Sequence, residues 1–155
     1  MYLPMIDTLV AMVDLKEYES SMSGLLGRLE TVKNHAQYNL KENISKKENI
    51  KIGDMEFQVL PNGKKGYAYI LHNELYELDI AQYRAKNKDF YPITVRVKSE
   101  ALWCLGPQKA WDRIYKLIDK RIGTIRTDKI SRIDLCCHTD EICLEIEDID
   151  KFKGK

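Results

Sequence analysis

The sequence predicts a single domain of the α+β class, an antiparallel sheet with two helices packed on one face. Several segments alternate apolar and polar residues and are separated by short turns, as antiparallel strands are. Two longer segments repeat apolar residues every three or four positions, as amphipathic helices do. The predicted order is β-α-β-β-β-β-α-β. We expect residues 1–155 to form one domain and to be the N-terminal part of a longer protein, because residues 147–155 begin a helical pattern without a terminator.

The first strand is predicted over residues 5–13, which are rich in Ile, Leu and Val. Asp14 suits a helix N-cap, and Glu17 three residues later completes a capping box. A helix is predicted over residues 15–40, because apolar residues recur there at helical spacing. We expect this apolar stripe to pack on the protein's own sheet, and a homodimer with the stripe against a second copy is the alternative.

Four strands are predicted in the middle of the chain. Residues 50–60 alternate apolar and polar side chains, and residues 61–66 contain the Asn-Gly signal of a tight turn. Three further alternating segments follow, at residues 67–71, 75–83 and 91–98. Their short connections predict a meander of antiparallel neighbours.

The second helix is predicted between Pro107, which suits a first helical position, and Gly123, which suits the residue after a helix. Its last turn carries positive charge, which is favourable at the negative end of the helix dipole. A turn is predicted over residues 126–129, and the last strand begins at Ser131.

The segment from Ser131 to Asp140 is the most informative for chemistry. Alternation places Arg132, Asp134 and His138 on one face of a strand that we expect to be buried. A carboxylate inside a sheet is costly unless it is paired or holds a metal ion. We therefore take Asp134, His138 and Asp140 as candidate ligands of a Mg²⁺ or Mn²⁺ ion, which oxygen ligands with one imidazole suit.

Such a site needs help from a neighbouring strand, because Asp134 and His138 lie about 13 Å apart along an extended strand. The side chains available for this are those of Glu77, Asp79 and His72. The alternative is that Asp134 forms a structural ion pair with Arg132 or Arg96.

The composition is that of an ordinary globular protein, with 44% hydrophobic residues, 32% charged residues and a net charge of +1. We expect a cytoplasmic protein with no membrane partner, because neither a long apolar run nor signal-peptide features occur. Residues 84–132 hold 13 Lys or Arg against 5 Asp or Glu, a local net charge of +8. Residues 133–150 hold 7 acidic residues and no Lys or Arg. This polarity predicts one basic face that contacts nucleic acid or an acidic protein.

Known catalytic motifs give little support to other functions. The sequence has no phosphate-binding loop, no nucleophile elbow and no Cys-x-x-Cys pair. Ordinary ATPase, hydrolase and structural zinc sites therefore lose support.

Tyrosines are interleaved with basic residues in the middle of the chain. Aromatic and basic side chains on a sheet can stack on bases and neutralise phosphates of single-stranded nucleic acid. Tyrosine is equally an ordinary strand residue, so both interpretations stay open. The tyrosines are Tyr67, Tyr69, Tyr76, Tyr83 and Tyr91, and the basic residues are Lys64, Lys65, Arg84, Lys86 and Lys88.

Three short tracts resemble the replication initiation proteins of plasmids, filamentous phages and conjugative elements. Residues 132–135 (Arg-Ile-Asp-Leu), which follow a basic helix, are similar to the Arg-x-Asp-Leu strand of that family. Residues 5–9 (Met-Ile-Asp-Thr-Leu) are similar to the strand with which many members begin. Residues 65–69 (Lys-Gly-Tyr-Ala-Tyr) resemble their middle hairpin.

The resemblance implies an antiparallel sheet that binds origin DNA, single-stranded or in a hairpin. It also implies a divalent cation, with Asp134 as a ligand, and a tyrosine nucleophile that nicks one strand to start rolling-circle replication. The family's second acidic residue, four positions after the aspartate, is His138 here, and Asp140 is its candidate substitute. The phosphate contacts that the resemblance implies are Arg96, Arg113, Lys116, Lys120 and Arg132.

One departure from the family bears on activity. Its nucleophilic tyrosine lies in a later segment, and none of the nine tyrosines here matches it. We therefore expect this chain to bind DNA without nicking it. Two other hypotheses stay open: a non-catalytic interaction module whose basic face docks an acidic partner, and a small metal-dependent enzyme built around Asp134 and His138.

Overall fold

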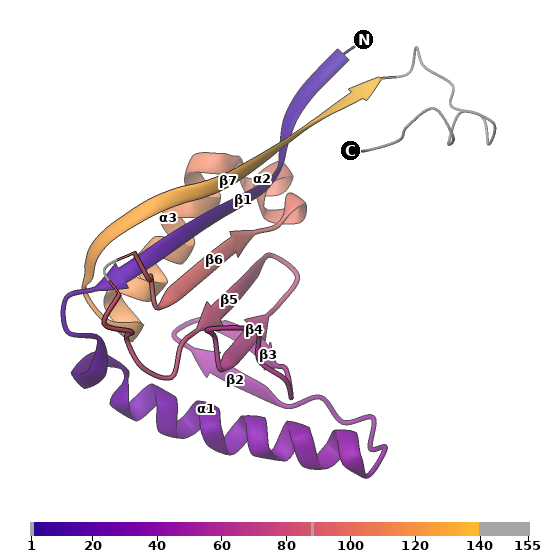
Figure 1. Cartoon of the computed structure of the whole chain (residues 1–155). Helices are drawn as coiled ribbons and strands as arrows, with labels where there is room; N and C mark the ends of the chain where they lie inside the picture. Colours follow the sequence, from indigo (N-terminus) through magenta and orange to yellow (C-terminus); the bar gives the residue numbers. More distant parts are fainter. Residues whose placement is uncertain (1, 88, 140–155) are drawn as a thin grey trace.

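The computed structural model describes residues 2–87 and 89–139, which form a seven-stranded antiparallel sheet with helices packed against it (Figure 1). This confirms the α+β class. The elements are, in chain order, β1 (Tyr2–Leu15), α1 (Tyr18–Lys41), β2 (Asn49–Ile52), β3 (Met55–Val59), β4 (Tyr69–His72), β5 (Tyr76–Ile80), β6 (Ile93–Val97), α2 (Ser99–Leu105), α3 (Pro107–Leu117), the π-helical turn η1 (Ile118–Ile122) and β7 (Ile125–Thr139).

The strands lie in the order β2-β3-β4-β5-β6-β1-β7, so the first strand of the chain is inserted between the last two. Strands β2 to β6 form the predicted meander. Strands β1 and β7 pair along nearly their whole lengths and form a ribbon that extends beyond the other strands (Figure 1). Three register shifts interrupt this pairing, and each marks an irregularity of the kind that bends and twists a strand.

The core lies on one face of the sheet. Alternate residues of β1, β3, β5 and β6, together with Tyr69 and Leu71 of β4, are buried and pack with the apolar sides of α1, α3 and η1 in one cluster. Ile70 of β4 is also buried, on the other face of the sheet. The cluster includes Leu9, Val13, Met22, Leu29, Phe57, Val59, Tyr69, Leu71, Tyr76, Leu78, Ile80, Val95, Ile114 and Ile118. Helices α2 and α3 lie behind β6, β1 and β7 and leave the near face of these strands uncovered (Figure 1).

Three core tyrosines tie other elements to the sheet through their hydroxyl groups. Tyr18, at the start of α1, donates to the carbonyl oxygen of Ala81 just after β5. Tyr76 on β5 donates to the Ala110 carbonyl oxygen of α3 at 3.0 Å. Tyr69 on β4 donates to Glu30 Oε2 of α1 at 2.7 Å, and burial, together with this carboxylate, raises the pKa of Tyr69 to about 12. A buried hydroxyl needs such a partner, so these bonds help to set how the helices sit on the sheet.

The predicted capping box is wrong. Asp14 does not cap α1, because it lies in β1, is buried, and accepts hydrogen bonds from Arg84 and Arg126. The helix begins at Tyr18, with Glu17 as its N-cap residue. The apolar stripe of α1 is confirmed to pack on the protein's own sheet.

Other boundaries also differ from the prediction. The strand predicted over residues 75–83 ends at Ile80, so Tyr83 lies in the loop after β5. Residues 50–60 form the hairpin β2–β3 instead of one strand, because Gly53 adopts a positive φ of 60° and turns the chain between Ile52 and Met55. Residues 99–105 form α2, which is too short to show a helical repeat. Residues 126–129 belong to β7 and not to a turn, because they pair with the end of β1.

No helix within the described residues is long and apolar enough to cross a membrane.

Two glycines give opposite expectations for stability. At Gly123, which joins η1 to β7, an added Cβ would lie 2.6 Å from Ser21 Cβ and 3.0 Å from Leu15 Cδ1. We expect Gly123→Ala to lower the free energy of unfolding by about 1–3 kcal/mol through overpacking.

At Gly24, within α1, an added Cβ meets nothing within 4 Å. We expect Gly24→Ala to raise the free energy of unfolding by up to about 1 kcal/mol, because alanine has the higher helix propensity. Urea unfolding measures the change in the free energy of unfolding for both variants. An unchanged free energy of unfolding for Gly123→Ala would contradict the close packing of α1 against Gly123.

Candidate nucleic-acid interface

The open face of the sheet, defined as the face opposite the helices, carries a row of side chains that crosses the whole sheet. One residue from each strand lies directly opposite its neighbour in the strand register, and none of them is buried. Six of the seven are polar or charged. From one edge to the other, this cross-strand row is Asn49, Gln58, His72, Glu77, Arg96, Val10 and Arg132.

The row is long enough to contact an extended chain of several nucleotides. Six strand spacings of about 4.8 Å give a length of roughly 29 Å. At the β2 end the row opens into a hollow of about 550 Å³, lined in part by Gln58 and His72 and flanked by Lys47 and Lys98. Cations and amides along an uncovered sheet are suited to phosphate and base-edge contacts.

A network of charges lies in the middle of the open face. Lys64 Nζ lies 2.5 Å from Glu77 Oε1 and 3.2 Å from Asp79 Oδ1, and both carboxylates are on β5. Burial alone would raise the pKa of Glu77, but the hydrogen bond and charge of Lys64, with Arg96 and Lys98 nearby, lower it. For Asp79, burial outweighs Lys64, so its pKa is raised. Lys64 is therefore held over β5 by two carboxylates.

Arg96 and Arg132 are the cations of the row that remain available to a ligand. Their side chains are 46% and 63% exposed, respectively. Arg96 Nη1 lies 3.9 Å from Glu77 Oε1, too far for a hydrogen bond. Exposed ion pairs contribute only about 0–1 kcal/mol, so a phosphate can compete with the carboxylates beside both arginines.

Asp134 does not lie in a buried strand, so that expectation is wrong. It lies on β7, at the edge of the sheet, and its side chain is 33% exposed. Arg132 Nε donates to Asp134 Oδ1 at 2.7 Å, as the ion-pair alternative predicts. The neighbouring Leu135 is 78% exposed, because helices cover little of this edge strand. The carboxylate therefore keeps contact with water, so the desolvation cost expected of a buried Asp134 is much smaller.

The structure does not bring the other candidate metal ligands close to Asp134. Glu77 and Asp79 lie on β5, three strand spacings or roughly 14 Å from β7, and His72 lies one strand farther. Within residues 2–87 and 89–139, no group of three His, Cys, Asp or Glu side chains could hold a metal ion. Asp140 and the side chain of His138 lie outside what the structure describes. A Mg²⁺ or Mn²⁺ site at Asp134, His138 and Asp140 therefore stays a prediction.

The five predicted phosphate contacts do not share one face. Arg96 and Arg132 point from the open face. Arg113 and Lys116 on α3 and Lys120 on η1 are exposed on the helix layer, on the other side of the sheet. The buried side of α3, formed by Ala110, Ile114 and Leu117, separates these three cations from the open face.

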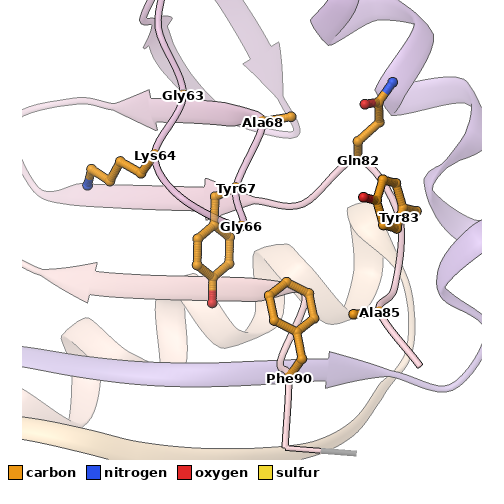
Figure 2. Close-up of a pocket in the computed structure, with 9 residues that line it drawn as sticks. All are labelled: Gly63, Lys64, Gly66, Tyr67, Ala68, Gln82, Tyr83, Ala85 and Phe90. Atoms are coloured by element: carbon orange, nitrogen blue, oxygen red, sulfur yellow. The ribbon is translucent and has the colours of Figure 1, made fainter. Parts of the chain in front are cut away.

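The interleaved tyrosines separate in the same way. Tyr69 and Tyr76 are buried in the core and act as strand residues. Tyr67 and Tyr83 instead line a pocket of about 390 Å³ together with Phe90 and Lys64 (Figure 2). This aromatic pocket adjoins the open face, because Thr94 Oγ1 of β6 donates to the Tyr67 hydroxyl at 2.8 Å. Tyr67 and Phe90 are stacked, with ring centroids 5.7 Å apart.

Two glycines in the loop before β4 make the aromatic pocket possible. Gly66 has a φ of 87°, and an added Cβ would lie 3.3 Å from the Phe90 ring. At Gly63 an added Cβ would lie 2.5 Å from the Tyr67 carbonyl oxygen. The Asn-Gly turn signal was wrong in position, because Gly63 lacks a positive φ and the tight turn lies between Lys64 and Tyr67, whose backbones hydrogen-bond to each other. The sequence pattern also did not indicate that the loop folds over the sheet. Phe90 was missed because no motif includes it.

A second missed group lies at the end of β1. Arg84 and Arg126 both donate to Asp14 Oδ2, and the Asp14 side chain is only 4% exposed. Among the described residues, Asp14 Oδ1 and Arg84 Nε are buried without a hydrogen-bond partner. A pocket of about 510 Å³ beside them is also lined by Lys86 and Glu19. The pattern that assigned Asp14 to a helix cap concealed this arginine cluster.

No protein-family model matches this chain, and neither a curated protein nor a solved structure matches it. The support for a function therefore comes from the residues and their arrangement.

His72 offers a pH test of the environment along the cross-strand row. Burial, followed by the charges of Lys98 and Lys47, lowers the pKa of His72 below 6.5, although Glu77 opposes this. The folded protein then binds the proton less tightly than the unfolded chain does. The stabilising contribution is fully present above pH 6.5 and is lost as the pH falls from 6.5 towards the folded pKa.

We expect an NMR titration to give a His72 pKa below 6.5. We also expect His72→Gln to remove the part of the stability loss that occurs in this pH range. A titration midpoint at or above 6.5 would contradict this environment, because the charge of Glu77 would then outweigh burial and the two lysines together.

Proposed function

We propose that this chain is the DNA-binding portion of a rolling-circle replication initiator and that it holds single-stranded or hairpin DNA against the open face. The observation that carries the proposal is the cross-strand row, which presents Arg96 and Arg132 on an uncovered sheet beside an aromatic pocket. Phosphate contacts from such cations supply affinity, and aromatic rings supply sequence-tolerant stacking.

The placement of the resembling tracts supports the initiator part of the proposal. Residues 5–9 lie on β1 and residues 132–135 lie on β7, more than 120 positions later in the sequence. The two tracts are neighbours in register, with Ile6 opposite Leu135, Thr8 opposite Asp134 and Leu9 opposite Ile133. The third tract, residues 65–69, contributes Tyr67 to the aromatic pocket. Two of the three tracts therefore lie on neighbouring strands, and the third lies at the pocket beside the open face of the same sheet.

The proposal assigns DNA binding to this chain and no strand cleavage. A Mg²⁺ or Mn²⁺ ion held by Asp134, with His138 and Asp140, belongs to the proposal only through the resemblance. It is tested by whether Mn²⁺ changes the DNA affinity of the wild type but not of Asp134→Ala. An equal Mn²⁺ response in both proteins would remove Asp134 from the metal site.

One observation favours a second candidate, an interaction module that docks an acidic protein. Arg113, Lys116 and Lys120 form an exposed basic surface on the helix layer, away from the aromatic pocket. An acidic protein surface needs cations but no aromatic stacking groups. The two candidates therefore place the ligand on opposite faces of the sheet.

Matched double variants separate the two faces. We expect Arg96→Ala with Arg132→Ala to weaken binding of single-stranded DNA by at least about tenfold and to reduce the salt slope by about 0.7 for each phosphate that is no longer neutralised. Lys116→Ala with Lys120→Ala removes the same charge from the helix layer and should leave the affinity within about twofold. Fluorescence anisotropy at two salt concentrations measures both. The reverse ranking of the two variants would contradict the proposal and favour the helix layer as the binding surface.

A further inference from the structure

We propose that the aromatic pocket lined by Tyr67, Tyr83 and Phe90 takes an unpaired nucleobase, and that the adjoining arginine cluster at Arg84 and Arg126 takes a neighbouring phosphate. This inference rests on the proposed function and specifies how the DNA is held. It concerns residues outside the cross-strand row.

The shape and lining of the aromatic pocket suit one planar ring. Its volume of about 390 Å³ lies near the lower end of the range of roughly 300–1,000 Å³ for ligand pockets. The stacked pair of Tyr67 and Phe90 forms one wall, with an angle of 29° between the rings. Gln82 also lines the pocket, and its amide can both donate to and accept from the edge of a base.

Tyr83 is a large aromatic residue that is exposed and does not belong to the core. The residue is 69% exposed although it lines the pocket (Figure 2). Tyr67 is fixed by its hydroxyl, which donates to the Tyr91 carbonyl oxygen at 3.0 Å and accepts from Thr94. The pocket therefore combines a fixed ring with an exposed ring, and a base that enters between them covers aromatic surface that now faces water.

The arginine cluster lies on the other side of the same chain segment. Tyr83 lines the aromatic pocket, the next residue, Arg84, lines the second pocket, and Ala85 lines both. The two pockets therefore adjoin across residues 83–85. A base and a phosphate of one strand are also neighbours, so one nucleotide segment can occupy both pockets.

The charges of the second pocket suit an anion. Asp14 neutralises one of the two arginines and holds both in place, so little side-chain entropy remains to be lost on binding. With Lys86 and Glu19 included, the formal charge of the five side chains is +1. Arginine donors arranged in a fork match the oxygens of a phosphate.

The test uses two fluorescent single-stranded oligonucleotides of equal length, one ordinary and one with abasic sites at its centre, at one salt concentration. The abasic strand keeps every phosphate and lacks only the central bases. We expect the wild type to bind the ordinary strand at least fivefold more tightly, since a stacked base contributes about 1–3 kcal/mol. We expect Tyr83→Ala to bind both strands equally and Tyr83→Phe to keep the preference. Lys86→Ala should weaken binding of both strands with the preference unchanged.

Each outcome decides between the base pocket and the proposed function. Equal wild-type binding of both strands, or a preference retained by Tyr83→Ala, would overturn the base pocket and leave DNA binding by the open face intact. An unchanged affinity of Lys86→Ala would overturn the phosphate assignment. No salt-sensitive binding of either strand would overturn the proposed function together with this inference. A thermal melt of Tyr83→Ala controls for folding, and its exposed side chain predicts an unchanged melting temperature.

Discussion

The alternation of apolar and polar residues along β3, β5 and β6 is the constraint on which the rest of the structure depends. It directs one side chain in two towards a core that α1, α3 and η1 complete. The helices must then lie on that side, because only there can they bury their own apolar surfaces. The remaining side chains form the open face, which the loop before β4 covers in part, and their registered pairing aligns the cross-strand row.

The position of β1 explains how distant segments meet on this face. Because β1 lies between β6 and β7, Val10 links Arg96 on one neighbour to Arg132 on the other. The end of β1 adds Asp14, which holds an arginine from the loop after β5 and another from β7. Truncating such a buried carboxylate leaves two cations without their partner, so this end of the sheet depends on one side chain. The proposed DNA contacts therefore rely on the strand with which the described chain begins.

Periodicity predicted the helices and strands that bury one face. It failed for residues whose role depends on contacts with distant parts of the chain. The stripe of α1 and the alternating strands were predicted, because burial dictates their residue types. Asp14 and Glu17 have the spacing of a capping box, yet the arginines that bind Asp14 come from positions 84 and 126. Asp134 looked buried because its neighbours are apolar, and only the edge position of β7 exposes them. The aromatic pocket depends on a loop folding over the sheet, which no local pattern encodes.

Mapping a bound strand onto the protein by amide NMR shifts tests the central claim most directly. The claim is that DNA occupies the open face, so a short single-stranded oligonucleotide should shift amides near Arg96, Arg132, Tyr67 and Tyr83. Amides of α3 near Lys116 should move little. Shifts concentrated on α3 and η1, with the cross-strand row unaffected, would contradict the account and place the ligand on the helix layer.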